Sequence, residues 1–301
     1  MKLVVYTFTL ILFGCIVSVS AGNSTCDRKC LLQILTIYTD GLQAKNINAI
    51  PVDPSVRITN NGEVTTLGNG RVWNTPGTLR LPYRHAVVDE VSGAATIQAT
   101  VTNYTENSLV GVPTNATANN TVWWFYSLRL KVVNSLITEI EELAGDTVFP
   151  GAPPASSLLW PDRIWDTLIP TDEQATRDEL QSVANDYFST VTGTIQWQDA
   201  PFHPECNRLE DADLTTNGLL FGGGCGTEFI NPTARWNVTN RRFYVMDSVR
   251  GVVVAVAMFT PPTPATVIME QFKIENGLIR HVEAFYDLEG QAAGSGWDSS
   301  S

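Results

Sequence analysis

Two polar patterns in the sequence combine side chains that could move a proton or hold a carbonyl oxygen. His281 and Glu283 are two residues apart in an apolar segment, so on a β-strand both would face the same side. Histidine titrates near neutral pH, and this pair could therefore serve as a general acid and base. Arg84 and Arg242 stand near the start of two similar segments and could donate hydrogen bonds to a developing negative charge. We predict catalytic roles for these four residues.

Aromatic side chains cluster beside both arginines in the sequence and could line an apolar pocket. The predicted substrate-binding residues are Trp73, Tyr83, Trp123, Trp236 and Tyr244. Trp73 follows the turn Gly68-Asn69-Gly70, which could let it act as a lid. A structural alternative stays open for each of them, because an aromatic residue on an antiparallel strand more often belongs to a core.

Other chemistries lack their sequence marks. The segment Gly222–Cys225 is not followed by the Lys-Ser/Thr of a phosphate-binding loop, and no Gly-x-Ser-x-Gly sequence of a hydrolase occurs. The cysteine spacings do not fit a zinc site, so we expect no metal. The 19 basic against 31 acidic residues give a net charge of -12, which argues against nucleic acid and anionic membranes as partners. An apolar small molecule is the expected partner.

An internal repeat organises the chain. Tyr83–Gly93 resembles Arg241–Gly251, and Leu130–Glu141 resembles Phe272–Glu283. The repeat offers the two arginines a structural alternative, because each recurs with an aspartate five residues later and could form an ion pair or cap a turn in its own copy. The histidine and glutamate described first have two glutamates as counterparts, which could instead mark a solvated or interdomain face.

A helix precedes the strands of each copy. Apolar residues recur every three or four positions over Leu31–Leu42 and over Leu180–Val191, as on one helical face, and Thr171 could cap the second helix. The strand Val252–Phe259 is apolar at every position, so we expect both of its faces to be covered. The sequence therefore predicts an α+β fold of two tandem domains that form an intrachain pseudo-dimer.

The beginning of the chain is typical of a secretory signal peptide. Lys2 precedes an apolar run to Val17, and small residues follow at Val19-Ser20-Ala21. We expect a signal peptide at 1–21, a first domain at 22–149, a linker at 150–170, a second domain at 171–290 and a tail at 291–301. The mature protein should be secreted or reside in the secretory lumen, without a membrane partner after cleavage. It should be a monomer with its internal pseudo-dimer, or a homodimer.

Cysteines and glycosylation signals agree with export. Four cysteines remain after removal of the signal peptide, and we favour the disulfides Cys26–Cys30 and Cys206–Cys225 because each pair is close in sequence. Acceptor sequences for N-glycosylation occur at Asn23, Asn103, Asn115, Asn119 and Asn237.

The pattern of helix and curved sheet, ending in a strand such as Phe272–Phe285, resembles the nuclear-transport-factor-2-like cone fold. That superfamily includes ketosteroid isomerases, scytalone dehydratases, polyketide cyclases and non-enzymatic binding domains. A narrower resemblance is to secreted fungal proteins with two such domains. Its marks are Thr59–Glu63, Leu67–Thr75, Tyr83–His85, Cys206–Glu210 with Thr215–Asn217, and Arg241–Phe243.

Proteins of similar architecture include the hetero-Diels–Alderases of fungal tropolone–sesquiterpenoid biosynthesis, which need no cofactor. The resemblance implies a secreted fungal enzyme of secondary metabolism that uses no cofactor and joins an apolar quinone methide to a terpenoid olefin by cycloaddition. Such catalysis requires a dry pocket that orients two partners, with donors aimed at a carbonyl oxygen. Two alternatives remain: a non-catalytic secreted binding protein or effector, and an isomerase or dehydratase of the same fold centred on His281 and Glu283.

Overall fold

The computed structural model describes residues 26–103, 121–146, 153–216, 224–226, 236–260, 265–287 and 294–297. The expected signal peptide and the acceptor residues Asn23, Asn115 and Asn119 lie outside the described residues. Among the helices of the described part, none is both long and apolar enough to cross a membrane.

Each half of the chain begins with an amphipathic helix. In α1 (Arg28–Ala44), the side chain of Asp27 accepts a hydrogen bond from the amide of Cys30 at 2.8 Å and caps the first turn. In α3 (Arg177–Val191), Thr176 and Glu179 form a reciprocal capping box. The expected cap at Thr171 is therefore wrong, because the capping box starts the helix five residues later. The buried faces carry the apolar residues that the sequence pattern predicts.

Each helix covers a six-stranded mixed sheet. The strands of the first sheet are β1 (Val52–Asn60), β2 (Glu63–Thr65), β3 (Arg84–Asp89), β4 (Ala94–Thr102), β5 (Trp123–Val133) and β6 (Leu136–Gly145), in the order β2-β1-β6-β5-β4-β3. The strands of the second sheet are β7 (Phe202–Glu210), β8 (Asp213–Leu214), β9 (Asn237–Asp247), β10 (Val252–Thr260), β11 (Thr266–Glu275) and β12 (Leu278–Tyr286), in the order β8-β7-β12-β11-β10-β9. Only β1–β6 and β7–β12 pair in parallel among these strands. The identical order confirms the predicted α+β class and its tandem repeat.

Short helices connect these elements. They are α2 (Arg71–Asn74) and the 3-10 helices η1 (Ile47–Ala49), η2 (Ala155–Ser157), η3 (Arg163–Asp166) and η4 (Trp197–Asp199). Two of them, η2 and η3, belong to the segment between the halves, where Trp165 is buried. The segment that joins the halves therefore packs down onto them, as its apolar residues suggest.

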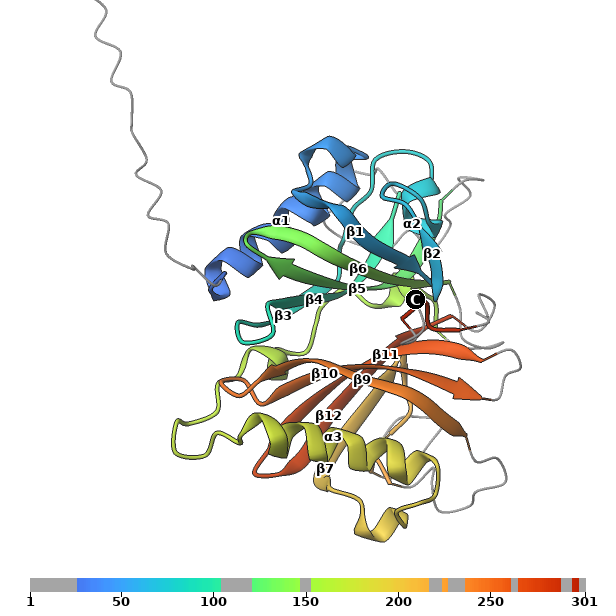
Figure 1. The fold of residues 1–301 in the computed structure, drawn as a ribbon. Coiled ribbons are helices and arrows are strands. Elements are labelled where there is room, and N and C mark those ends of the chain that lie inside the picture. Colours follow the sequence, from blue (N-terminus) through green and yellow to red (C-terminus); the bar gives the residue numbers. More distant parts are fainter. Residues whose placement is uncertain are drawn as a thin grey trace, which may run out of the picture.

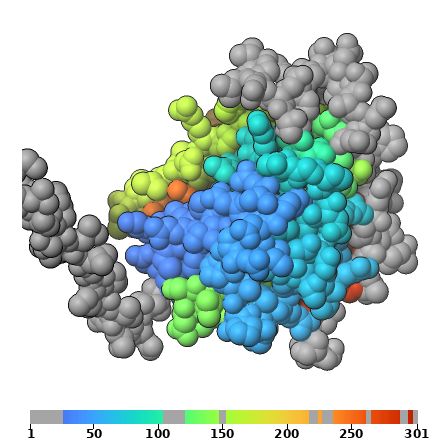
Figure 2. Space-filling view, turned by 90° about the horizontal axis from the view of Figure 1, so that it is seen from above, coloured from blue at the N-terminus to red at the C-terminus, as the bar shows by residue number. Residues whose placement is uncertain are grey.

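The two sheets face each other, with α1 and α3 on the outer sides (Figure 1). Viewed from the α1 side, residues of the first half cover most of the second half (Figure 2). The strand β10 is buried on both faces, as its sequence predicts. Its residues Val253, Ala255, Ala257 and Phe259 belong to the core under α3, whereas Val252, Val254, Val256 and Met258 pack with Val87, Ala94 and Leu143 of the first half.

Equivalent tight turns show the repeat at atomic detail. Gly93 and Gly251 both have positive φ, and a Cβ at either would run into the carbonyl oxygen of the strand beside it. The amides of Val132 and Ile274 donate to the carbonyl oxygens of these two glycines at 2.8 Å and 2.7 Å. Only glycine fits such a position without strain, which explains why both copies retain it.

Both favoured disulfides are present. Cys26–Cys30 links the start of α1, with its Cα atoms 5.2 Å apart, and Cys206–Cys225 joins β7 to a turn, with its Cα atoms 5.5 Å apart. Of the two described acceptor asparagines, Asn237 is exposed at the start of β9. Asn103 is half-buried, and its side-chain amide donates to the carbonyl oxygen of Pro76 at 3.0 Å.

Candidate functional site

One carboxylate at the domain interface collects donors from both halves and from the segment between them. Glu283 is fully buried on β12. The Tyr83 hydroxyl donates to both of its oxygens at 2.9 Å, the Trp165 indole donates at 3.0 Å, and His85 Nε2 lies 3.0 Å from Oε1. Burial raises the pKa of Glu283, but His85, His281 and the hydrogen bond from Tyr83 together outweigh it, so the pKa lies below its usual range. This carboxylate is saturated by the protein itself.

The predicted partner of Glu283 lies in the same interface cluster. His281 is buried, and its ring meets the Trp165 indole edge-on at a centroid distance of 5.2 Å. Desolvation lowers the pKa of His281, although the charge of Glu283 opposes this. His85 stacks on the other side of the cluster, parallel to Trp165 at 5.1 Å, and its Nδ1 lies 3.2 Å from the amide of Gln271. The arrangement holds the domains together.

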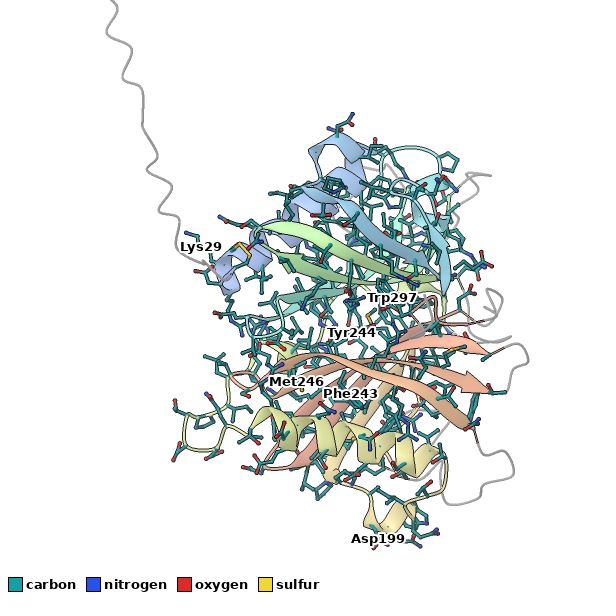
Figure 3. All side chains as sticks on the ribbon, viewed as in Figure 1. Lys29, Asp199, Phe243, Tyr244, Met246 and Trp297 are labelled. Carbon is teal, nitrogen blue, oxygen red and sulfur yellow. A yellow bond between two sulfur atoms is a disulfide. The ribbon has the colours of Figure 1, made fainter. Side chains whose placement is uncertain are left out.

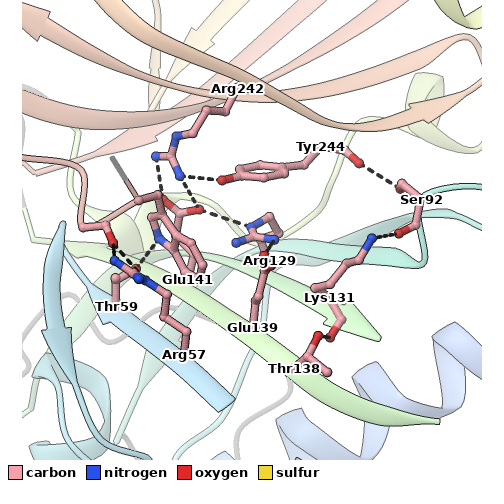
Figure 4. A network of polar contacts seen from close by, with 12 residues as sticks. Arg57, Thr59, Ser92, Arg129, Lys131, Thr138, Glu139, Glu141, Arg242 and Tyr244 are labelled. Carbon is pink, nitrogen blue, oxygen red and sulfur yellow. Dashed lines mark hydrogen bonds and ion pairs between the residues drawn. The ribbon is translucent and has the colours of Figure 1, made fainter. Parts of the chain in front are cut away.

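A second interface cluster surrounds Glu141, the repeat counterpart of Glu283. Arg242 crosses from the second sheet and reaches both Glu141 oxygens, at 2.8 Å and 3.1 Å, while Arg129 donates at 3.2 Å (Figure 4). Tyr244 lies between the arginines, with the Arg129 guanidinium 3.7 Å from its ring centroid. Trp297 closes the cluster from the C-terminal side, 4.7 Å from the same guanidinium. Along β9, Phe243 faces α3 whereas Tyr244 faces the first half (Figure 3).

The ion pairs that the arginines could form with the aspartates of their own copies are not present, but Asp89 accepts hydrogen bonds from the amides of Val91 and Ser92, as the alternative of a turn cap allowed. Asp89 pairs with Arg177 of α3 at 2.7 Å, and Asp247 pairs with Arg28 of α1 at 2.7 Å. Both ion pairs therefore cross the domain interface in a reciprocal manner. Arg84 is exposed on its strand.

The remaining predicted residues are scattered. Trp123 is half-buried against the small apolar cluster of Tyr83, Phe125 and Phe285. Trp73 is buried in the core of the first half, and Trp236 is partly exposed beside the core of the second. The structure thus brings most of the predicted residues to the interface, and their catalytic and substrate-binding roles stay predictions.

The interior of the first half, between α1 and its sheet, contains a saturated polar centre. Glu142 of β6 is buried and accepts hydrogen bonds from the hydroxyls of Tyr38, at 2.9 Å, and Tyr126, at 2.5 Å. The Asn60 amide lies 3.5 Å from its other oxygen. Burial raises the pKa of Glu142 while its hydrogen bonds, including one from Trp73, lower it, and burial prevails. We call this interior the first cone.

The corresponding interior of the second half, which we call the second cone, contains a cavity of about 110 Å³. Its polar and aromatic lining includes Tyr187, Arg208, Glu210, Trp236, Glu270 and Tyr286. Arg208 pairs with Glu210, and the Tyr286 hydroxyl donates to Glu210 at 3.4 Å. Trp236 stands edge-on to Phe259 at a centroid distance of 6.1 Å. One end of the cavity is therefore aromatic and the other is charged.

Glu270 of β11 is the distinctive group of the second cone. Its side chain is buried, and Oε1 accepts a hydrogen bond from the Tyr187 hydroxyl at 3.2 Å. Oε2 is buried and has no hydrogen-bond partner among the described residues. Burial, together with the charge of Glu210 and against that of Arg208, raises the pKa of Glu270 to about 8. A carboxyl group with a free oxygen and such a pKa can give or take a proton near neutral pH.

The sequence analysis missed Glu270, although the sequence carries a signal for it. Glu270 interrupts the apolar run Val267–Met269 of a buried strand, where a carboxylate requires a specific reason to be buried. Tyr187 lies on the helical face that the sequence predicts over Leu180–Val191, and that prediction makes no use of its hydroxyl. Of the predicted substrate-binding residues, Trp236 alone is in the lining of this cavity. No group of three or more His, Cys, Asp or Glu side chains that could hold a metal occurs among the described residues.

Comparisons with known proteins concern single domains. A family model described as a domain of unknown function, DUF8021, matches residues 173–286, which is the second domain. No curated protein matches the chain. One similar solved structure is a proposed ketosteroid isomerase from Kribbella flavida, at 15% identity over 36% of this chain and 78% of that chain, with a TM-score of 0.30.

Two further solved structures give similar values. AusH from Aspergillus nidulans is 13% identical over 40% of this chain and 88% of that chain, with a TM-score of 0.30. An NTF-2-like protein of unknown function from Shewanella oneidensis is 10% identical over 38% of this chain and 97% of that chain, with a TM-score of 0.24. Each similarity covers about one domain, and the tandem arrangement follows from the two sheets of this chain.

Proposed function

We propose that the chain is an enzyme whose second cone moves a proton within an apolar small molecule, in a reaction of isomerase or cyclase type. The observation that carries this proposal is the buried carboxyl group of Glu270. Its Oε2 lacks a hydrogen-bond partner among the described residues, and the residue belongs to the lining of the cavity. The reaction class agrees with the sequence resemblance to ketosteroid isomerases and polyketide cyclases. It replaces the interface pair His281 and Glu283 by Glu270 as the proton carrier.

The proposed step uses the two protonation states of Glu270. In its ionised form, Oε2 takes a proton from a carbon next to a substrate carbonyl, and the electrons of that C–H bond pass into an enolate. The neutral acid then returns the proton to another carbon, so that the double bond moves and no atom is gained or lost. A carboxylate with a pKa of about 8 is a stronger base than an ordinary one, which favours removal of a proton from carbon. Tyr187 orients the carboxyl through Oε1.

The experiment uses cyclohex-3-enone as a small, uncharged probe in deuterated water. Proton NMR follows both its conversion to cyclohex-2-enone and the entry of deuterium. We expect catalysis above a boiled-protein control, with a rate that rises with pH and levels off near pH 8. Glu270→Gln keeps the shape and the hydrogen-bonding capacity but cannot carry the proton, so its rate should fall by about a hundredfold or more.

The matched control is Glu142→Gln in the first cone. It makes the same chemical change to a buried glutamate that also bonds a tyrosine of the preceding helix. Its rate should stay close to that of the unaltered protein. A Glu270→Gln protein with undiminished catalysis would contradict the proposal. Binding of the probe without turnover would instead favour the non-catalytic binding protein.

A cofactor-free hetero-Diels–Alder cycloaddition of a quinone methide with a terpenoid olefin is the second candidate. It is favoured by the aromatic walls of the cavity and by hydrogen-bond donors such as Tyr187 that could polarise a carbonyl. The cavity of about 110 Å³ is smaller than the engineered protein cavity of about 150 Å³ that holds benzene, so both partners require it to widen. The same variant separates the candidates: Glu270→Gln still offers an N–H donor, so a cycloaddition should keep most of its rate.

We further propose that the protein acts outside the cell or in the secretory lumen. Two disulfides support an oxidising compartment. The exposed Asn237 at the start of β9 would be accessible to glycosylation. Mass spectrometry of the protein from the medium of a secreting host should find the chain beginning at Gly22 and a glycan on Asn237. Retention inside the cell with an intact amino terminus would contradict export.

A further inference from the structure

The first cone contains more polar groups than an apolar core requires. Glu142 and the hydroxyls of Tyr38 and Tyr126 converge in an interior that the structure otherwise fills with apolar side chains. Burying a carboxyl group is costly, and an apolar substitute of similar size is often as stable. Three converging polar groups therefore point to something that they recognise.

The side chain that lies against these groups comes from a separate small element. Trp73 of α2 meets the Tyr38 ring edge-on at a centroid distance of 6.2 Å. Its side chain lies close enough to Glu142 and Tyr38 to lower the pKa of both groups, against the burial that raises them. Its indole is a flat aromatic group with one N–H donor. Trp73 thus occupies the first cone in the manner of a bound ligand.

The element that carries Trp73 is held by few polar contacts. The Lys45 ammonium donates to the carbonyl oxygens of Val72, at 2.7 Å, and Trp73, at 2.6 Å. Arg71 pairs with Asp287 of the second half at 2.8 Å. Because α2 has four residues, it has no helical stability of its own, and these contacts, together with the burial of Val72 and Trp73, keep it in place.

The segment before α2 can absorb a change of backbone direction. Gly68 and Gly70 have φ values of 87° and 138°, and the second is accessible only to glycine. A Cβ on Gly70 would lie 2.7 Å from the Asn60 side chain, so this glycine also lets α2 start close to β1. Two such glycines provide a hinge on the amino-terminal side of Trp73.

We propose that the first cone is a second ligand site, which the chain's own Trp73 fills and which opens when α2 swings away. The ligand is an uncharged, flat aromatic molecule with an N–H or O–H donor that replaces the indole against Glu142. This site is independent of the cavity around Glu270, and either one can exist without the other.

Indole is the probe, and Trp73→Ala is the first variant. In calorimetric titration, the variant should bind one indole per chain at least about tenfold more tightly than the unaltered protein, and indole should raise its Tm. Adding Glu142→Leu to this variant should weaken indole binding by about tenfold through loss of the acceptor, but should leave benzene binding unchanged. A folded Trp73→Ala protein that binds indole no better than the unaltered one overturns the proposal. Equal indole binding by the single and double variants overturns it as well.

Lys45→Met tests the opening itself and does not depend on removing Trp73 from the core. It keeps the indole but lacks the two hydrogen bonds that hold α2. Indole should bind this variant more tightly than the unaltered protein and less tightly than Trp73→Ala, with faster deuterium exchange of the amides at 71–75. A folded Lys45→Met protein with unaltered indole binding shows that α2 does not act as a lid, and overturns the proposal.

Discussion

The two cones share a tyrosine at the same position of their helices, but they differ in how the buried glutamate beside it is satisfied. Tyr38 and Tyr187 stand at equivalent places in α1 and α3, and each donates its hydroxyl to a buried glutamate. The glutamate of the first cone comes from β6, whereas that of the second comes from β11, one strand away in its sheet. Glu142 is saturated by two tyrosines, whereas Glu270 lines a cavity and has one oxygen without a hydrogen-bond partner in the part of the chain that the structure describes. Moving one carboxyl group by one strand thus separates a cone that its own side chains fill from a cone that contains a cavity.

The pH dependence of stability provides the largest test of this difference. Because burial raises the pKa of Glu270 from 4.5 to about 8, its stabilising contribution is complete below pH 4.5 and is lost as the pH rises towards 8. The loss amounts to roughly 4–5 kcal/mol at about 1.4 kcal/mol per pH unit. We therefore expect the free energy of unfolding, measured by urea titration, to fall more steeply with pH for the unaltered protein than for Glu270→Gln between these pH values. Parallel curves would show that Glu270 is ionised in the folded protein.

Removing each carboxyl group in turn compares how much the two glutamates contribute to the free energy of unfolding. Glu142→Ala leaves two buried tyrosine hydroxyls without an acceptor and creates a void, so we expect a loss of about 3 kcal/mol in the free energy of unfolding. Glu270→Ala affects one tyrosine and enlarges an existing cavity that water can enter, so about 1 kcal/mol is expected at pH 6. Denaturant titration of both variants at that pH measures the difference. Equal losses would show that the two carboxyl groups do not differ in how well the protein satisfies them.

The reciprocal ion pairs between the halves should differ to a smaller extent. Asp89 also accepts hydrogen bonds from the amides of Val91, Ser92 and Met246, so it keeps partners when Arg177 is removed. Among the described residues, the Asp247 carboxylate pairs with Arg28 alone. The arginines are partly exposed, so we expect a loss of about 2 kcal/mol for Arg28→Ala and about 1 kcal/mol for Arg177→Ala. Thermal unfolding of both variants checks the order, and a larger loss for Arg177→Ala would contradict it.

Much of the fold could be predicted because the signals are local. The repeat, the helical faces and the turns at Gly93 and Gly251 depend on residues close in sequence. The correct helix cap could also have been predicted locally, because Thr176 and Glu179 have the spacing of a capping box, whereas Thr171 was the wrong choice. The continuous apolar run of β10 also sufficed to predict a covered sheet.

The site could be predicted less well, because its contacts join distant residues. Arg28 and Asp247, or Tyr83 and Glu283, meet only after the two halves dock, and no local pattern assigns such partners. Glu270 is visible in the sequence as an acid directly after the apolar run Val267–Met269. Whether its second oxygen has a hydrogen-bond partner depends on side chains from other elements, and none of the described residues supplies one. A pattern can therefore show that a group is unusual without showing whether it is satisfied.

Strand β10 serves two cores, since its alternate side chains enter the second cone and the contact with the first half. Adjacent positions of this strand are therefore constrained by packing against different parts of the protein. In an evolutionary comparison, Val253, Ala255 and Ala257 should vary together with α3, while Val252, Val254 and Val256 should vary together with Val87 and Leu143. Because both halves pack against this one strand, a substitution in one half restricts which substitutions the other half can accept.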